Sequence, residues 1–566
     1  MFAYPYAVMM KVKNIILAIT SLYMLLIMHI YIPNMGGSGL LLPGNIIGWI
    51  VILLIILYAW CHFDHFSILK VNSSCYLFLI GILFLSIPIF NQNIFSNQQG
   101  TIRVLAVFGG LVCYLTFLQC QFSAKDKIFI LWILVGSALV EAVLVLLQAF
   151  ILSENNWMEF DILSSRPYGI FQQVNVMASF ISTGLVIGIY LYIMRNDRKG
   201  FFPIGIRTID VANITLLFSL LLFSMTIVLL QSRIGYLGSI LSGGFLLMTH
   251  YKNNKLHCFI VVLFIIVGVF NGFLILSENI ITQVSHSSSN NERLLILKYT
   301  WEMIQQKMWL GWGYGGFEYG FHHFLAGKIP AISMNRVTHP HNELLFWWVE
   351  GGVFALVGML FLLAGYLRLL FYPRNKISAS LWLLTLPITL HMMTEYPLYQ
   401  SVAHIITLIL LLSLITNDTK VNSGLIPVKM KFFNSVVVLF SLCALYFMVT
   451  GFKTSIVLTN LERGRFISFA PARELYNPYI NITRYKFDEQ MHNLILFNTN
   501  KDSKLLQDYL IWGDEYSKCY VNINVYFNMI KIANFLNMHG KVKQLVSEAR
   551  LLFGYRDDFI VYLDGL

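Results

Sequence analysis

The chain has 566 residues, of which 57% are hydrophobic and only 12% are charged, whereas soluble domains carry about 25% charged residues. Together with a mean hydropathy of +0.68, this composition excludes an ordinary soluble protein and predicts a polytopic membrane protein in a lipid bilayer. The net charge of +11 would fit a nucleic-acid partner. We expect none, because the positive residues are distributed along the chain as a topology signal.

Apolar runs of about 20 residues predict about 13 transmembrane helices, within a range of about 12 to 14, and hence an all-α fold. In chain order the runs lie near 14–32, 45–60, 74–90, 101–120, 128–152, 175–194, 211–231, 234–250, 256–276, 344–366, 379–395, 399–416 and 433–451. The seven cysteines show no paired spacing, so the sequence predicts neither a disulfide framework nor a zinc site.

Lysine and arginine residues indicate which helix ends face the cytoplasm. Seven alternate connections together hold 17 of these residues, whereas the short connections of the other set hold only Arg166 and Arg233. Positive residues mark the cytoplasmic side, so the N-terminus is predicted to lie inside. The long loop 277–343, between the ninth and tenth helices, and the tail 452–566 are then predicted to face outward.

The tail differs in composition from the apolar region 1–451. From about Leu461, apolar residues recur at helical spacing among polar ones, and Gly540 is predicted to end one amphipathic helix before the next begins. This pattern predicts a small helical-hairpin domain, loosely similar to a tetratricopeptide unit, with a role in packing or in docking a partner.

Four arginines are predicted at the outer face, where positive charge opposes the insertion preference. Arg233 lies in a very short connection between two predicted helices, so its depth is fixed. Arg103 lies at the start of the fourth run, Arg166 in a loop, and Arg293 in a stretch with the pattern of an amphipathic helix. Because a guanidinium fork suits phosphate oxygens, these residues predict a site for a lipid diphosphate. The alternative is contact with lipid headgroups or structural ion pairing.

The segment His339-Pro340-His341-Asn342-Glu343 precedes the tenth predicted helix. Two histidines alone are a weak metal signal, so we predict no metal site. A neutral imidazole above the membrane can instead accept a proton from an attacking hydroxyl as a general base. The alternative is a hydrogen-bonded loop histidine, with Asn342 as the helix N-cap and Glu343 in the first helical turn.

Two further features, a glycine-rich segment and a glutamate in a turn, are candidates for a functional site. The segment 311–317, GWGYGGF, is glycine-rich like a phosphate-binding loop, but no strand precedes it and no Lys-Ser/Thr follows it. We expect a close backbone approach to a lipid or sugar there, or a flexible lid. Glu395, in the turn between the eleventh and twelfth predicted helices, either orients a histidine or arginine or caps the turn.

Taken in order, these motifs resemble those of a known family. Arg-x-x-Gly-x-Phe-x-Gln-x-Asn occurs at 166–175, Ser-Arg at 232–233, His-x-His-Asn-Glu-Leu-Leu at 339–345 and Glu-Tyr-Pro-Leu at 395–398. The set resembles that of the bacterial O-antigen ligase and polymerase superfamily. It is most similar to the pilin-type protein O-oligosaccharyltransferases, the O-linked protein glycosylation ligases. The resemblance extends from about residue 100 into the tail.

The resemblance implies a multi-pass enzyme of the bacterial inner membrane with GT-C-like transmembrane helices. Its large loop between helices 9 and 10, its active site and its C-terminal helical domain are expected to be periplasmic. Such an enzyme moves a preassembled oligosaccharide from undecaprenyl diphosphate to a periplasmic acceptor protein such as a pilin, without a cofactor. The resemblance identifies His341, Arg233 and Arg293 as catalytic. Further residues expected at the substrates are Arg103, Arg166, Asn175, His339, Asn342, Glu343 and Glu395.

The resulting hypothesis is a single displacement with inversion at the anomeric carbon. His341 accepts the proton of a Ser or Thr hydroxyl, while Arg233 and Arg293 neutralise the departing diphosphate. The nearest alternatives are an O-antigen polymerase and a lipid A-core ligase, both with a sugar hydroxyl as the acceptor. A transporter or flippase is the alternative from another class, although the sequence shows no internal repeat of the kind transporters carry.

Overall fold

The computed structural model describes residues 3–63, 68–91, 97–162, 166–196, 210–278, 287–326, 328, 336–371, 375–416, 424–427, 430–554 and 556–565. The chain divides into two compact units. The first unit comprises 1–77, 109–285 and 364–456, and the second unit comprises 78–108, 286–363 and 457–566.

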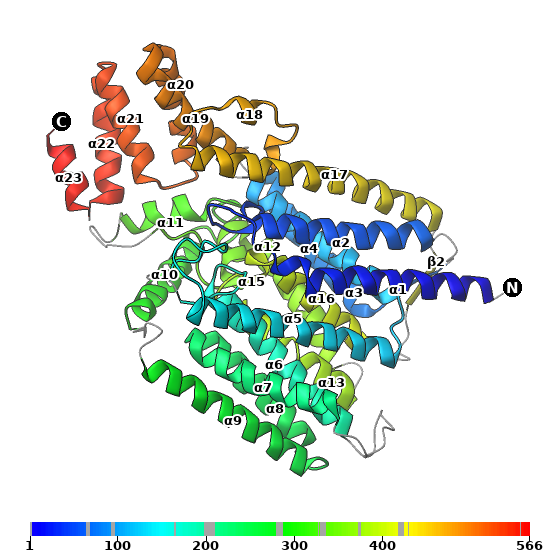
Figure 1. Ribbon diagram of the computed structural model, residues 1–566. Coiled ribbons are helices and arrows are strands. Elements are labelled where there is room, and N and C mark those ends of the chain that lie inside the picture. Colours follow the sequence, from blue (N-terminus) through cyan, green and yellow to red (C-terminus); the bar gives the residue numbers. More distant parts are fainter. Residues whose placement is uncertain are drawn as a thin grey trace. The chain divides into compact units, whose positions relative to one another are not determined.

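Helices make up nearly all of the regular structure described (Figure 1). The α-helices are α1 (Ala3–Leu25), α2 (Pro43–His62), α3 (Ser73–Ser86), α4 (Asn97–Gln119), α5 (Ala124–Phe150), α6 (Val174–Asn196), α7 (Val211–Leu230), α8 (Arg233–Tyr251), α9 (Lys255–Ser277), α10 (Ser287–Gln306), α11 (Phe317–Ala326), α12 (Glu343–Phe371), α13 (Lys376–Leu383), α14 (Leu386–His391), α15 (Pro397–Gln400), α16 (Val402–Thr416), α17 (Met430–Arg463), α18 (Ala470–Arg473), α19 (Ile482–Asn500), α20 (Ser503–Ser517), α21 (Ile523–Phe535), α22 (His539–Phe553) and α23 (Asp557–Asp564). Short 3₁₀ helices are η1 (Ile27–His29), η2 (Gly39–Leu41), η4 (Ile87–Asn91) and η5 (Pro478–Asn481). The strands β1 (Ile68–Val71) and β2 (Gly424–Pro427) form one antiparallel pair in the first unit, which the all-α prediction did not include.

Within the described residues, ten helices are long and apolar enough to cross a membrane. They are α1, α2, α3 continued by η4 as far as Phe90, α4, α5, α6, α7, α9, α12 and α17. The other three predicted runs correspond to α8, to the pair α13 and α14, and to α16. Glycine, serine and histidine make α8 less apolar, Pro387 follows the break between α13 and α14, and α16 has only 15 residues. The chain is therefore a polytopic membrane protein, and about 13 spans stays a prediction.

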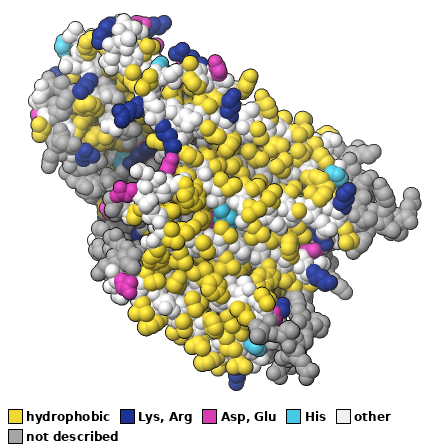
Figure 2. Space-filling view, viewed as in Figure 1, with side chains coloured by type: hydrophobic (Ala, Val, Ile, Leu, Met, Phe, Trp, Pro, Cys, Tyr) yellow, Lys and Arg dark blue, Asp and Glu magenta, His cyan; other side chains and the backbone are white. Residues whose placement is uncertain are grey.

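Exposure separates the helices that face lipid from those that form the core of the first unit. α6 is buried throughout from Val176 to Ile193, and it packs against α5, α7 and α8. α9 packs against α7 on one side and exposes large apolar side chains on the other, for example Phe259, which is 66% exposed. Figure 2 shows hydrophobic side chains over much of the face that it draws. Such surfaces are stable in hydrocarbon and not in water.

The segment between α9 and α12 contributes two helices to the second unit. α10 and α11 pack together through Ile296, Tyr299, Met303 and Phe321, which are all buried. Part of the predicted outer loop, including residues 279–286 and 329–335, lies outside the described residues.

The tail forms a succession of packed helices from α19 to α23, in which each helix contacts the next (Figure 1). The tail belongs to the same unit as α11. The two are joined by a hydrogen bond from the backbone N–H of Val521 to the Glu318 carboxylate at 2.9 Å. The predicted helix end at Gly540 is wrong by a few residues. α21 ends at Phe535, Asn537 adopts a left-handed conformation (φ 57°), and Gly540 lies in the first turn of α22. Asparagine tolerates this conformation and replaces glycine at the helix end.

Candidate functional site

The ten predicted site residues are all described, and they divide between the two units. The first unit holds Arg166, Asn175, Arg233 and Glu395. The second unit holds Arg103, Arg293, His339, His341, Asn342 and Glu343.

In the first unit, Arg233 is exposed at the start of α8. α7 ends where Gln231 adopts a left-handed conformation (φ 48°, ψ 38°), and α8 begins after the extended residue Ser232. The connection is as short as the sequence predicts. It places a guanidinium at the N-terminal end of a helix, where the helix dipole also favours anions.

Arg166 binds the end of α7. Its Nη1 donates to the carbonyl oxygens of Leu230 at 3.1 Å and Gln231 at 3.3 Å. A helix leaves its last carbonyl groups without intrahelical partners, and a cation satisfies them well. Burial lowers the pKa of Arg166 below its usual value. These contacts support the structural alternative for Arg166.

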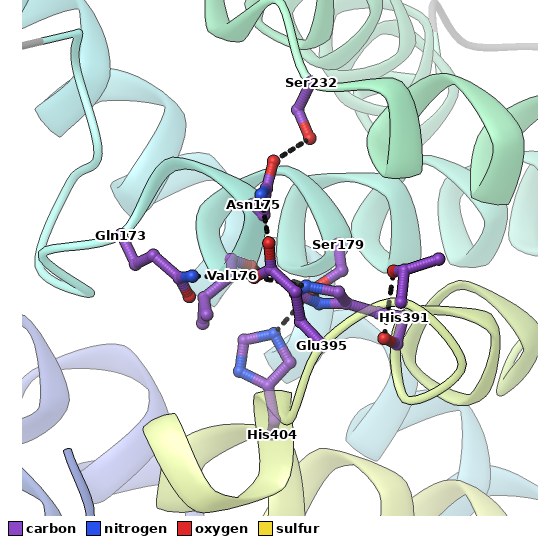
Figure 3. A network of polar contacts seen from close by, with 9 residues as sticks. Gln173, Asn175, Val176, Ser179, Ser232, His391, Glu395 and His404 are labelled. Atoms are coloured by element: carbon purple, nitrogen blue, oxygen red, sulfur yellow. Dashed lines mark hydrogen bonds and ion pairs between the residues drawn. The ribbon is translucent and has the colours of Figure 1, made fainter. Parts of the chain in front are cut away.

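Glu395 lies at the centre of a buried polar network drawn in Figure 3. Its carboxylate accepts hydrogen bonds from Nε2 of Gln173 at 2.6 Å and Nδ2 of Asn175 at 2.7 Å. The Oδ1 atom of Asn175 accepts a hydrogen bond from the Ser232 hydroxyl at 2.7 Å. Nε2 of His391 lies 3.4 Å from the carboxylate. The sequence predicts that Glu395 orients either a histidine or an arginine or caps the turn. In the structure the histidine near its carboxylate is His391.

The same network contains residues that the sequence reasoning missed. Ser179 Oγ lies 2.9 Å from His391 Nδ1 and 3.1 Å from His404 Nε2, and it donates to the carbonyl oxygen of Val176. Although serine, histidine and glutamate here follow the order of a nucleophilic triad, Ser179, His391 and His404 are fully buried. Their complete burial argues against a nucleophilic role and favours a structural one. Two histidines inside apolar runs, one of them four residues before Glu395, were the available signal.

In the second unit, the histidine pair lies at the start of α12. The rings of His339 and His341 lie 4.4 Å apart between centroids, and His341 adopts a left-handed conformation (φ 56°). Asn342 Oδ1 accepts a hydrogen bond from the backbone N–H of Leu345 at 3.0 Å. This contact confirms the N-cap alternative for Asn342.

Arg103 is buried against α12. It forms an ion pair with Glu350, and its guanidinium lies over the rings of Phe346 at 4.5 Å and Trp347 at 5.0 Å. Glu343 is also buried and interacts electrostatically with Arg103. This arrangement favours the structural ion-pair alternative for Arg103, and it gives Glu343 a partner within the protein.

Glu350 also contacts the backbone of the glycine-rich segment 311–317. Its Oε1 accepts hydrogen bonds from the backbone N–H groups of Gly315 at 3.0 Å and Phe317 at 3.2 Å. α12 is kinked at Gly352 (φ 64°, ψ −157°), which allows its backbone to approach residues 309–313. The close approach expected for these glycines therefore occurs within the protein, between this segment and α12.

Arg293 lies half-buried in α10, whose neighbouring residues Ile296 and Tyr299 pack into the second unit. Among the described residues, no group of three or more His, Cys, Asp or Glu side chains has the geometry to hold a metal ion. His322, near the histidine pair in sequence, accepts a hydrogen bond from the backbone N–H of Val337 at 3.0 Å. Burial lowers the pKa of His322 to about 4, so it is neutral near pH 7.

Three family models match separate parts of the chain. The O-antigen ligase model matches residues 218–360, which include Arg233, Arg293 and His341. A model for the C-terminal part of virulence factor membrane-bound polymerases matches residues 379–561. The protein glycosylation ligase model matches residues 167–192, which include Asn175.

A curated relative gives the same indication. The chain is 24% identical over 303 residues to a general O-oligosaccharyltransferase of Acinetobacter baylyi, and the match covers 48% of each protein. The chain thus matches about half the length of that relative. Together with the motifs, these matches support placing the chain in the superfamily of O-antigen ligases and protein glycosylation ligases.

Proposed function

We propose that this membrane protein is an O-linked oligosaccharyltransferase. It transfers a preassembled glycan from undecaprenyl diphosphate to a Ser or Thr hydroxyl of a periplasmic protein such as a pilin, at the outer face of the inner membrane. One observation carries the proposal: the protein glycosylation ligase match contains Asn175, which contacts the turn bearing the exposed Arg233. The relative named for general O-oligosaccharyl transfer supports the same acceptor class.

In the proposed reaction, the acceptor oxygen attacks the anomeric carbon of the first sugar. The bond from that carbon to the diphosphate oxygen breaks, and the electron pair leaves with the undecaprenyl diphosphate. His341 accepts the hydroxyl proton, a contribution of about 10²- to 10⁴-fold. The proposal includes no second carboxylate as a nucleophile, so one displacement inverts the anomeric centre.

Arg233 and Arg293 are proposed to stabilise the negative charge of the leaving diphosphate. Arg233 suits this role because it is exposed and lies in the first turn of α8, where the helix dipole favours anions. Arg293 is half-buried in α10 and is proposed for the same chemistry on the basis of the family resemblance. Arginine presents a fork of donors that matches phosphate oxygens.

The alternative function is an O-antigen polymerase, which shares the lipid-linked donor but uses a sugar hydroxyl as the acceptor. The observation that favours it is the polymerase model matched over residues 379–561. A lipid A-core ligase would use the same donor and a sugar acceptor as well.

The testing experiment measures glycan transfer by the purified protein from lipid-linked oligosaccharide to a candidate pilin, with EDTA present. His341→Ala is compared with His539→Ala, a control at an exposed histidine of α22 outside the proposed site. Loss of transfer in His341→Ala and not in the control supports the proposal. Bare pilin together with lengthened lipid-linked glycan would show a polymerase instead.

A further inference from the structure

Two residues of the motif at 166–175, Arg166 and Asn175, reach the same short turn of the first unit. Arg166 donates to the carbonyl oxygens of Leu230 and Gln231, directly before Ser232 and Arg233. Asn175 accepts a hydrogen bond from the hydroxyl of Ser232. Each residue beside Arg233 in this turn is therefore held by a side chain from elsewhere in the unit.

The orientation of the Asn175 amide follows from its partners. The NH₂ group of Asn175 donates to a carboxyl oxygen of Glu395, since an amide nitrogen can only donate. The amide oxygen then faces the Ser232 hydroxyl, which donates to it. A serine at a helix N-cap usually accepts from the first turn, but Ser232 makes no such cap bond. Its hydroxyl holds the turn to α6 instead (Figure 3).

The start of α8 is also held by its backbone. A Cβ atom on Gly235 would lie 2.9 Å from the Cβ of Ala178, so α8 approaches α6 as closely as glycine permits. The Ser182 hydroxyl donates to the carbonyl oxygen of Gly235 at 2.9 Å. Asn175, Ala178 and Ser182 follow one another at the spacing of a single helix face. One face of α6 therefore contacts the first turn of α8.

We infer that Arg166, Asn175 and Ser232 are positioning residues that hold Arg233 in place for the diphosphate of the donor lipid. The inference rests on the proposed function of Arg233. It assigns the Arg166–Asn175 motif to donor binding rather than to recognition of the acceptor protein. Because Arg233 is exposed on a turn that its neighbours fix, little conformational freedom of its backbone is lost when the diphosphate binds.

The test measures the Kd of the purified full-length protein for undecaprenyl diphosphate, together with the KM values for donor and acceptor in glycan transfer. Arg233→Ala is expected to weaken lipid binding about 10- to 100-fold, as for loss of a charged hydrogen-bonding group. Ser232→Ala and Arg166→Ala are each expected to weaken it about 3- to 10-fold. Combined with Arg233→Ala, they add no further loss. Ser232→Thr keeps the hydroxyl and restores binding.

Gln173→Ala is the matched control, because the side chain of Gln173 donates to the Glu395 carboxylate rather than to the turn. Hydrogen–deuterium exchange of the peptide spanning residues 230–236 gives a readout that is independent of substrate. Faster exchange is expected in Ser232→Ala and not in Gln173→Ala.

Unchanged exchange in Ser232→Ala overturns the inference, and so does a loss that is additive with Arg233→Ala or confined to the acceptor KM. Wild-type lipid affinity in Arg233→Ala, by contrast, overturns the proposed function of Arg233 itself.

Discussion

Asn175 donates a hydrogen bond to the Glu395 carboxylate at 2.7 Å, across 220 positions of sequence. The bond joins the segment matched by the protein glycosylation ligase model to the segment matched by the polymerase model. A buried carboxylate is costly unless donors surround it, and residues 173–175 supply two of them. Two motifs that are separate in sequence thus form one polar network.

The first prediction concerns the charge of this network. In Glu395→Gln, one oxygen becomes an NH₂ group that faces the amide NH₂ of Gln173 or Asn175, so one buried donor loses its acceptor. We expect the free energy of unfolding to fall by about 1–3 kcal/mol, measured as a lower Tm in detergent. Glu474→Gln changes an exposed carboxylate and serves as the control. Equal Tm values for the two variants would contradict the prediction.

The sequence predicts most of the helices because a bilayer demands long apolar runs, and ten such runs form long helices. It does not separate α13 from α14, because local backbone geometry rather than hydropathy sets the break near Pro387. Likewise, partners remote in sequence decide the roles of the arginines. Arg103 looks available for phosphate until its pairing with Glu350, 247 positions away, is known. A glutamate within the apolar run that follows Asn342 was the available signal.

The second prediction distinguishes a structural Arg103 from one that binds diphosphate. Arg103→Ala leaves the buried Glu350 without its ion-pair partner, a change that costs about 3–5 kcal/mol when one partner is removed. We expect a large fall in Tm and loss of folded protein. Arg103→Ala combined with Glu350→Gln should recover part of that stability, because the uncompensated charge is removed. If Arg103→Ala instead folds normally and raises only the donor KM, Arg103 binds the substrate.

The third prediction concerns the kink in α12. Gly352 adopts φ 64° and ψ −157°, a region that is essentially restricted to glycine. A Cβ atom there would also lie 2.7 Å from the carbonyl carbon of Leu310. Gly352→Ala should lower the free energy of unfolding by more than about 3 kcal/mol, from backbone strain and steric clash together.

Gly540→Ala is the matched control, because Gly540 is helical and no atom lies within 4 Å of its added Cβ. It should be neutral or stabilising by up to about 1 kcal/mol. Similar Tm values in the two variants would argue against the kink geometry.

The last prediction is a pH dependence in the tail. Burial raises the pKa of Asp488 from 3.8 to about 8, with a further rise from the negative charge of Glu462 and an opposing effect of Arg484. Between pH 4 and 8 the unfolded chain therefore loses this proton while the folded chain retains it, so the contribution of Asp488 to stability declines as the pH rises.

Asp488→Asn removes the titration. The Tm of this variant minus that of the wild type, measured from pH 4 to 9 in detergent, should increase with pH up to about pH 8. Above pH 8 the difference should stay constant. Asp508→Asn, at an exposed carboxylate of α20, should follow the wild type over the whole range. Parallel curves for Asp488→Asn and wild type would mean that Asp488 is already ionised in the folded protein.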